Sequence, residues 1–301
     1  MTDARRIAQN RAAHDRLRAG YDARHPEIHN PIEQARLTAS VARAVGAITS
    51  ATPIADRVML DVGAGTGNLT EKLLAHPGRV IAGDLSAGML EDLARRFVFV
   101  VAVPIGPSTE EARGATDAAR VRLTTQLLNG ADLRPLADAS VDLVGAYSVL
   151  HHVPDYLALV DEMVRVLRPG GVILLEHEKA PQYWTPSPAL ERFLNGAVVW
   201  PEKRWTRFVD PRRYWARIRP HLIWRRWFDA RWMPEGDIHI WPDDHVEWAS
   251  VEARLRAGGC VPVAVEDHLA YEPRFDRAAW EAARHEATDT RMHLARKAEA
   301  R

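Results

Sequence analysis

The sequence predicts an α/β fold, in which a doubly wound, Rossmann-like sheet of seven mainly parallel strands is flanked by helices. Short apolar segments with the character of strands alternate with amphipathic segments from about Val58 to Lys179. A glycine-rich turn, DVGAGTG, separates the first strand from its helix, and a further helix and strand follow between His245 and Leu269. This alternation is typical of parallel sheets, which bind ligands at the carboxyl ends of their strands.

The first 47 residues are expected to form an N-terminal helical lid. One helix is predicted from about Asp3 to Gly20, and a second from Pro31 to about Ala47, because proline is favoured in the first turn of a helix. The segment 48–180 is expected to be the ligand-binding core. Its predicted strands are RVMLDV, GRVIAGDLS, RVRLTTQLL, SVDLVGAYSV and GGVILLEHEKA, and its predicted helices are TGNLTEKLLAH, AGMLEDLARRF (capped by Ser86) and YLALVDEMVRVL.

The remaining segments are expected to add an insertion, a cap and the edge of the sheet. Residues 98–121 interrupt the core with polar, loop-like sequence. The segment 181–240, dense in Trp, Arg and Pro, is expected to be a helical substrate cap inserted after the fifth strand. Its tryptophans either wall an acceptor pocket or pack the core of the cap. The segment 241–270 is expected to complete the sheet, and 271–301 to form a polar C-terminal helix.

Charge and cysteine content narrow the class of protein. The 301 residues include 40 basic and 40 acidic side chains, so no strong field draws the chain to nucleic acid or to an anionic membrane. The single cysteine, Cys260, excludes an internal disulfide and a cysteine zinc site. No apolar run approaches the roughly 20 residues that span a bilayer. We therefore expect a cytoplasmic protein that acts on a small molecule and contacts neither nucleic acid nor membrane.

The glycine-rich turn distinguishes two classes of cofactor. A dinucleotide site requires G-x-G-x-x-G, whereas this turn reads G-x-G-x-G, and Asn68 occupies the position of the third dinucleotide glycine. Asp61 ends the strand just before the turn, where a carboxylate repels pyrophosphate and attracts an ammonium group. Asp84, at the end of the next strand, suits a pair of ribose hydroxyls in either class. The turn therefore favours a ligand with an amino-acid group over a nicotinamide dinucleotide.

Five ordered motifs resemble one family. The turn with Asp61, the acid Asp84, and the segments NGADLRPLADASVDLV, SVLHHVPD and VLRPGGVILLE are similar in order and spacing to class I S-adenosylmethionine-dependent methyltransferases. The resemblance is closest to the small-molecule branch, which includes ubiquinone, menaquinone and natural-product methyltransferases. It implies S-adenosyl-L-methionine as the cofactor and a small-molecule methyl acceptor, with methylation at O, N or C left open.

The resemblance also implies roles for individual residues of the cofactor site. Asp61 would place the amino group of the donor, Asp84 its ribose hydroxyls, and Leu85 its adenine face. The other residues implied in cofactor binding are Tyr21 in the lid, Gly63, Ala64, Gly65 and Gly67 in the turn, Ala131, Asp132 and Leu133 near the adenine amino group, and Tyr147 near the sulfonium.

Histidines near the ends of the fourth and fifth strands are candidates for removing a proton from the acceptor, because histidine titrates near neutrality. His152 is the first candidate base and His151 the second; the alternative is catalysis by positioning alone. His177 is a further catalytic candidate, and Glu176 a candidate for binding substrate. Strand alternation predicts that Glu176 and Glu178 share one side while His177 faces the other. The alternative for this group is a hydrogen bond that fastens the cap.

The stretch GDIHIWPDDHVEW at 236–248 supports two interpretations. Its histidines and acids could bind a metal, but Pro242 and the two aspartates that follow also begin an ordinary helix, with Glu247 in its first turn. We favour the helix, no metal, and contacts of His239 and Trp241 with substrate. The alternatives for the whole chain are a family member with other chemistry and a non-catalytic partner subunit. The oligomeric state, with a homodimer as one option, stays open.

Overall fold

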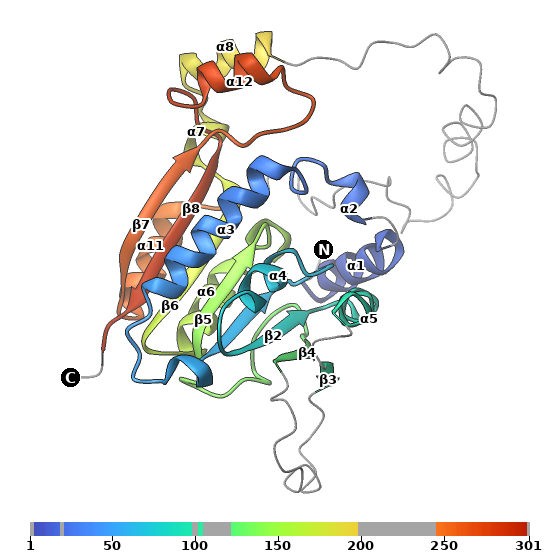
Figure 1. The fold of residues 1–301 in the computed structure, drawn as a ribbon, viewed down its shortest axis with the longest axis vertical. Coiled ribbons are helices and arrows are strands. Elements are labelled where there is room, and N and C mark those ends of the chain that lie inside the picture. Colours follow the sequence, from blue (N-terminus) through green and yellow to red (C-terminus); the bar gives the residue numbers. More distant parts are fainter. Residues whose placement is uncertain (1–2, 19–20, 98–101, 105–121, 198–244, 300–301) are drawn as a thin grey trace, which may run out of the picture.

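The computed structural model describes residues 3–18, 21–97, 102–104, 122–197 and 245–299 (Figure 1). Within these ranges the fold is a single sheet with helices on both faces. The strands are β1 (Val58–Val62), β2 (Arg79–Asp84), β3 (Ala102–Pro104), β4 (Leu123–Leu127), β5 (Val141–Tyr147), β6 (Leu167–Lys179), β7 (Cys260–His268) and β8 (Thr290–Lys297). None of the described helices is long and apolar enough to cross a membrane.

The sheet has the predicted doubly wound, mainly parallel character. The strand order is β3-β4-β2-β1-β5-β6-β8-β7, so the chain begins in the middle and winds outward in both directions. Pairs from β3 to β6 are parallel, whereas β8 runs antiparallel to both β6 and β7. The sheet has eight strands where seven were predicted, and the three residues of β3 form a short strand at one edge.

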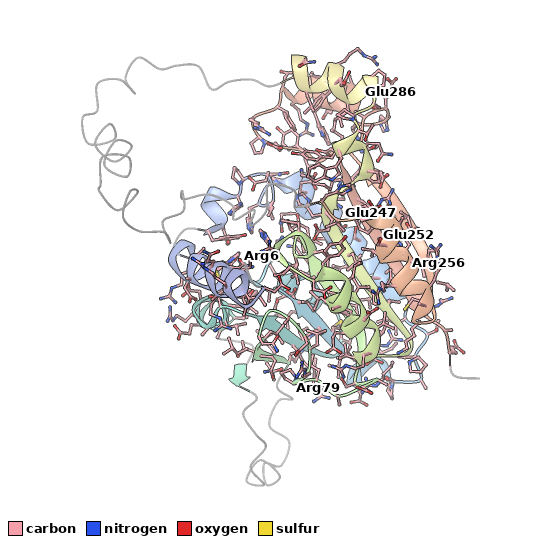
Figure 2. All side chains as sticks on the ribbon, turned by 180° about the vertical axis from the view of Figure 1, so that it is seen from behind. Arg6, Arg79, Glu247, Glu252, Arg256 and Glu286 are labelled. Carbon is pink, nitrogen blue, oxygen red and sulfur yellow. The ribbon has the colours of Figure 1, made fainter. Side chains whose placement is uncertain are left out.

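Two apolar layers fix the helices on the sheet. On one face, α3 (Pro31–Gly46) and α4 (Asn68–Leu74) contribute Leu37, Val41 and Leu73 to the core, and α5 (Ala87–Arg96) contributes Leu93. On the other face lie α6 (Tyr156–Val166) and α11 (Trp248–Ala257), seen from behind in Figure 2 with Glu252 and Arg256 on α11. Because both faces are covered, the central strand β1 is buried along its whole length.

Capping residues set the helix starts where the sequence placed them. The side chain of Asn30 accepts hydrogen bonds from the amides of Ile32 and Glu33, with Pro31 in the first turn of α3. Ser86 accepts from the amide of Met89 and caps α5, as predicted. The α11 helix starts at Trp248, so Glu247 is its N-terminal flanking residue rather than part of its first turn.

The lid and the cap are described in part. The segment predicted to be a lid contains α1 (Asp3–Leu17) and α2 (Tyr21–Arg24), followed by α3. In the cap, α7 (Pro181–Trp184) and α8 (Pro188–Gly196) are described, and 198–240 lies outside the described residues. The α8 helix packs against α12 (Arg277–Ala283) through Phe193, Phe275 and Trp280, beyond the ends of β7 and β8 (Figure 1).

The prediction of a polar C-terminal helix over 271–301 is wrong. The α12 helix is short, and 290–297 forms β8, which lies between β6 and β7. The charged residues that suggested an exposed helix are internally paired: Arg291 binds Asp267 of β7, and the ammonium of Lys297 donates to the carbonyls of Val164 and Leu167. The charged residues of 290–297 therefore led to the prediction of a helix where the structure has an interior strand.

An interior β8 makes a specific prediction about stability. Leu294 is fully buried between the two neighbouring strands, so Leu294→Ala should lower the free energy of unfolding by about 2–5 kcal/mol. Val261→Ala on β7 is the control, because this side chain is 51% exposed and its loss should cost less than about 1 kcal/mol. Denaturant unfolding of the two variants checks this; equal, small effects would contradict an interior β8.

Candidate functional site

A cleft opens at the carboxyl ends of β1, β2 and β5, the edge at which parallel sheets bind ligands. It is bounded by the glycine turn after β1, by the loop after β5 and by the lid. Nine of the residues singled out in the sequence line it: Tyr21, Asp61, Gly63, Ala64, Gly65, Asp84, Leu85, Tyr147 and His152. Segments far apart in the chain therefore meet in one cavity.

The first glycine of the turn, Gly63, is required because its backbone lies close to the side chain of Val149. Gly63 has φ of +70°, and a Cβ atom there would lie 2.6 Å from Cγ2 of Val149 in the loop after β5. Gly67 does not line the cleft, and a Cβ there would lie 2.7 Å from the ring of Phe97; its role in binding the cofactor stays a prediction. Gly67 thus lets the start of α4 pack against the end of α5.

Asp84 is held in place by the backbone around it. Its carboxylate accepts hydrogen bonds from the amides of Gly65 (2.9 Å) and Ser86 (2.8 Å). Burial raises the pKa of Asp84, and these amide hydrogen bonds oppose the rise. An ionised carboxylate offers about four acceptor positions, so two remain for a ligand such as a ribose diol.

Asp61 is also buried, and its carboxylate has fewer hydrogen bonds than that of Asp84. Its carboxylate accepts a hydrogen bond of 2.6 Å from the Thr70 hydroxyl. Burial raises the pKa of Asp61 to about 7, the Asp84 carboxylate adds to the rise, and hydrogen bonds from Thr70 oppose it. A cationic ligand group would lower this pKa and gain a strong partner, because an opposite charge favours the ionised form.

The lid is fastened to both sides of the cleft. In α1, the amide of Asn10 donates to the carbonyl of His152 at 3.3 Å, and the ring of His14 meets that of His152 edge-on at 5.7 Å. Asp22 of α2 accepts a 2.6 Å hydrogen bond from Thr66 in the glycine turn. Asn10 and His14 also line the cleft. Sequence reasoning missed this pair, although their spacing of one helical turn was a signal that they share a face.

The two neighbouring histidines have different surroundings. His152 lines the cleft, whereas Nδ1 of His151 lies 2.8 Å from Glu178. Glu178 also accepts hydrogen bonds of 2.7 Å from the amides of Val149 and Leu150, so one buried carboxylate holds the whole turn after β5. The sequence placed Glu178 only in a group with Glu176 and His177 that would contact the acceptor or fasten the cap, because nothing local in the sequence reveals its distant partners.

A β-bulge overturns the predicted alternation at the end of β6. His177 has φ of +61°, rare for a residue other than glycine, and the pairing of β6 with β8 slips by one residue between Leu175 and Glu178. As a result Glu176 and Glu178 serve different partners. Nη1 of Arg36 on α3 lies 2.8 and 2.9 Å from the two oxygens of Glu176, while Glu178 binds the turn after β5.

Glu176 and His177 do not line the cleft, and their direct roles toward substrate stay predictions. Glu176 is fully buried in its ion pair with Arg36. His177 lies behind Tyr147, with the two rings stacked at a centroid distance of 5.0 Å. Burial lowers the pKa of His177 well below its usual range, and the Arg36 charge lowers it further, so the ring is neutral at pH 7. The alternative, a hydrogen bond that fastens the cap, stays a prediction, since the described side-chain partner of Glu176 is Arg36 on α3.

The segment expected near adenine also lies elsewhere. Ala131 and Asp132 border a separate depression together with Ile7 of the lid, and Leu133 is fully buried. Asp132 is engaged by Asn129 and Arg134. The contact of these three residues with the cofactor stays a prediction.

The expected substrate residues His239 and Trp241 lie outside the described residues. Close to them in sequence, the ring of His245 stacks on Trp184 of α7 at 4.9 Å. Among the described residues, no group of three His, Cys, Asp or Glu side chains could hold a metal ion.

Comparison with known proteins agrees with this geometry. A family model described as a methyltransferase domain matches residues 60–175. A probable S-adenosylmethionine-dependent methyltransferase of Mycolicibacterium smegmatis is 40% identical over 110 residues, which are 36% of this chain and 38% of that protein. Demethylmenaquinone methyltransferase of Clavibacter sepedonicus is 31% identical over 46% of this chain and 47% of that protein. The matched segments thus span half or less of these relatives.

Among solved structures, geranyl diphosphate C-methyltransferase of Streptomyces coelicolor A3(2), in complex with Mg²⁺, geranyl diphosphate and S-adenosyl-L-homocysteine, is 17% identical with a TM-score of 0.47. That alignment covers 86% of this chain and 79% of the other. The sequence match places the cleft's turn, both aspartates and the two histidines inside the family's domain. Residues 60–175 therefore match a family described as a methyltransferase domain.

Proposed function

We propose that this chain is an enzyme that transfers the methyl group of S-adenosyl-L-methionine to a small-molecule acceptor. The observation that carries the proposal is the pair of buried carboxylates, Asp61 and Asp84, at the ends of adjacent strands on either side of the glycine turn. Asp84 would accept hydrogen bonds from the ribose hydroxyls, and Asp61 would bind the amino group. The names of the curated relatives, among them a trans-aconitate 2-methyltransferase, support a small-molecule acceptor.

The chemistry required of the protein is limited. The acceptor atom attacks the methyl carbon while the carbon–sulfur bond breaks, and the bonding electrons return to sulfur, which becomes a neutral thioether. The protein must align the acceptor, exclude water and take up the proton that the acceptor loses. In this proposal His152 takes the proton, because it lines the cleft. His151, held by Glu178, would fix the turn that presents His152.

Calorimetric titration tests the cofactor assignment. Wild-type protein should bind S-adenosylmethionine and leave NADH unbound, and Asp84→Ala should weaken donor binding by at least tenfold, because the ribose loses a charged hydrogen-bond partner. Asp92→Ala on the exposed side of α5 is the control and should bind like the wild type. Binding of NADH, or an unaltered affinity in Asp84→Ala, would contradict the assignment.

Donor binding should depend on pH through Asp61. Its pKa of about 7 in the free protein means that the carboxyl group must lose a proton before it can pair with an ammonium group. Affinity should therefore be constant above pH 7 and fall by up to about tenfold per pH unit below it. Titrations from pH 5.5 to 8.5 check this, and Asp61→Asn should bind weakly at every pH. An unchanged wild-type affinity across this range would argue against the role of Asp61.

Measurements of turnover should distinguish the roles of His152 and His151. His152→Ala should lower kcat by about 10²–10⁴-fold while the donor Kd changes little, because a general base contributes on this scale. His151→Ala should have a smaller effect on kcat. Single-turnover methyl transfer from labelled S-adenosylmethionine to an acceptor found by screening provides the measurement. The reverse order would assign the base to His151, and small effects in both would indicate catalysis by positioning alone.

A further inference from the structure

Three buried polar atoms beside the cleft have no hydrogen-bond partner. They are the hydroxyl of Tyr147, Nη2 of Arg36 and Nδ1 of His177. A buried polar group left unpaired costs about 1–3 kcal/mol, so several at one place call for an explanation. Their positions on three different elements, β5, α3 and β6, make a local packing fault an insufficient one.

These atoms belong to one connected cluster. The rings of Tyr147 and His177 stack at 5.0 Å. Glu176 joins the other two groups, because its Oε2 accepts from Nη1 of Arg36 at 2.9 Å and from the amide of His177 at 2.9 Å. Tyr147 also lines the cleft, so the cluster adjoins the cavity in which the donor would bind.

Two of the three unsatisfied groups, the Tyr147 hydroxyl and Nη2 of Arg36, can donate. The two carboxylates of the cluster are already engaged: Glu33 accepts from Nε of Arg36 at 2.8 Å and from the amide of Tyr271 at 2.9 Å, and Glu176 accepts from Arg36 and His177. The guanidinium Nη2 can only donate, and the tyrosine hydroxyl has its proton available. The ligand that satisfies them must therefore supply an acceptor atom such as oxygen.

The charges of the cluster decide the kind of oxygen. One guanidinium faces two buried carboxylates, so Arg36, Glu33 and Glu176 together carry a net negative charge, and Lys179 adds a positive charge near His177. Burial raises the pKa of Tyr147 well above its usual range, and burial and Arg36 lower that of His177, so both rings are neutral at pH 7. A carboxylate or phosphate would meet repulsion here, whereas a neutral oxygen would not.

Of the three groups Tyr147 alone lines the cleft, and we propose that its hydroxyl forms a subsite for an uncharged hydroxyl or carbonyl oxygen of the methyl acceptor. This inference rests on the proposed methyl transfer and extends it by naming the acceptor class: a neutral alcohol, phenol or ketone rather than an acid. Tyr147 lies at the end of β5, next to the turn that carries His152, so an acceptor held here would lie close to the candidate base.

The test measures binding of two matched probes, phenol and benzoate, to the full chain saturated with S-adenosyl-L-homocysteine. Ligand-observed NMR titrations should show phenol binding more tightly than benzoate. Tyr147→Phe should weaken phenol binding by about three- to tenfold, the worth of one hydrogen bond. It should not lower the thermal midpoint, because no internal hydrogen bond is lost. Tyr183→Phe, at a side chain 41% exposed, is the matched control and should bind phenol like the wild type.

Several results would overturn the subsite. Tighter binding of benzoate, no binding of phenol by the wild type, or equal phenol affinity in Tyr147→Phe would each do so. A thermal midpoint lowered by Tyr147→Phe would mean that the hydroxyl has a structural partner. Failure of the protein to bind S-adenosyl-L-homocysteine is a separate result, visible before either probe is added, and it would overturn the proposed function itself.

Discussion

Four carboxylates at the carboxyl ends of β1, β2 and β6 are buried. The hydrogen bonds and the ion pair that stabilise these buried charges hold the turns and helices at this edge of the sheet in place. Asp61, Asp84, Glu176 and Glu178 are each at most 6% exposed. A buried charge is tolerated only when it is paired or hydrogen-bonded. Amides of the loop after β2 and the glycine turn serve Asp84, Arg36 serves Glu176, and the turn after β5 serves Glu178. Burial raises the pKa of Asp61 to about 7 and also raises the pKa of Asp84.

Because of the bulge at His177, Glu176 and Glu178 bind partners on different elements, α3 and the turn after β5. In a regular strand Glu176 and Glu178 would project to the same side. The extra residue separates them, so that one carboxylate anchors α3 while the other holds His151 and the backbone before it. The positive φ of His177 stores strain of about 1–3 kcal/mol, a cost that native structures retain chiefly at functional sites. The same bulge stacks His177 behind Tyr147.

The sequence contained enough information for the centre of the fold. Runs such as VMLDV and VDLVGAY are buried on both faces and read directly as parallel strands, and Pro31 and Ser86 mark helix starts through their own chemistry. The cleft residues contributed by the first turn were predictable for the same reason, since a strand, a glycine turn and a helix are local in sequence.

Long-range pairing was not predictable. The interior position of 290–297 depends on Asp267 and two carbonyl groups that neutralise its charges, and none of these is near it in sequence. Glu176 was assigned to substrate because its partner Arg36 is 140 residues away. The bulge that separates it from Glu178 arises from pairing with β8, a strand that the sequence reading had made a helix.

A crystal structure of the complex with S-adenosyl-L-homocysteine would test the central claim most directly. The ribose hydroxyls should lie within hydrogen-bond distance of Asp84, and the amino group should lie on Asp61, both inside the cleft between the glycine turn and the lid. A nucleoside bound outside this cleft, or a ribose held by residues other than Asp84, would contradict the proposal that the buried carboxylates form the methyl-donor site.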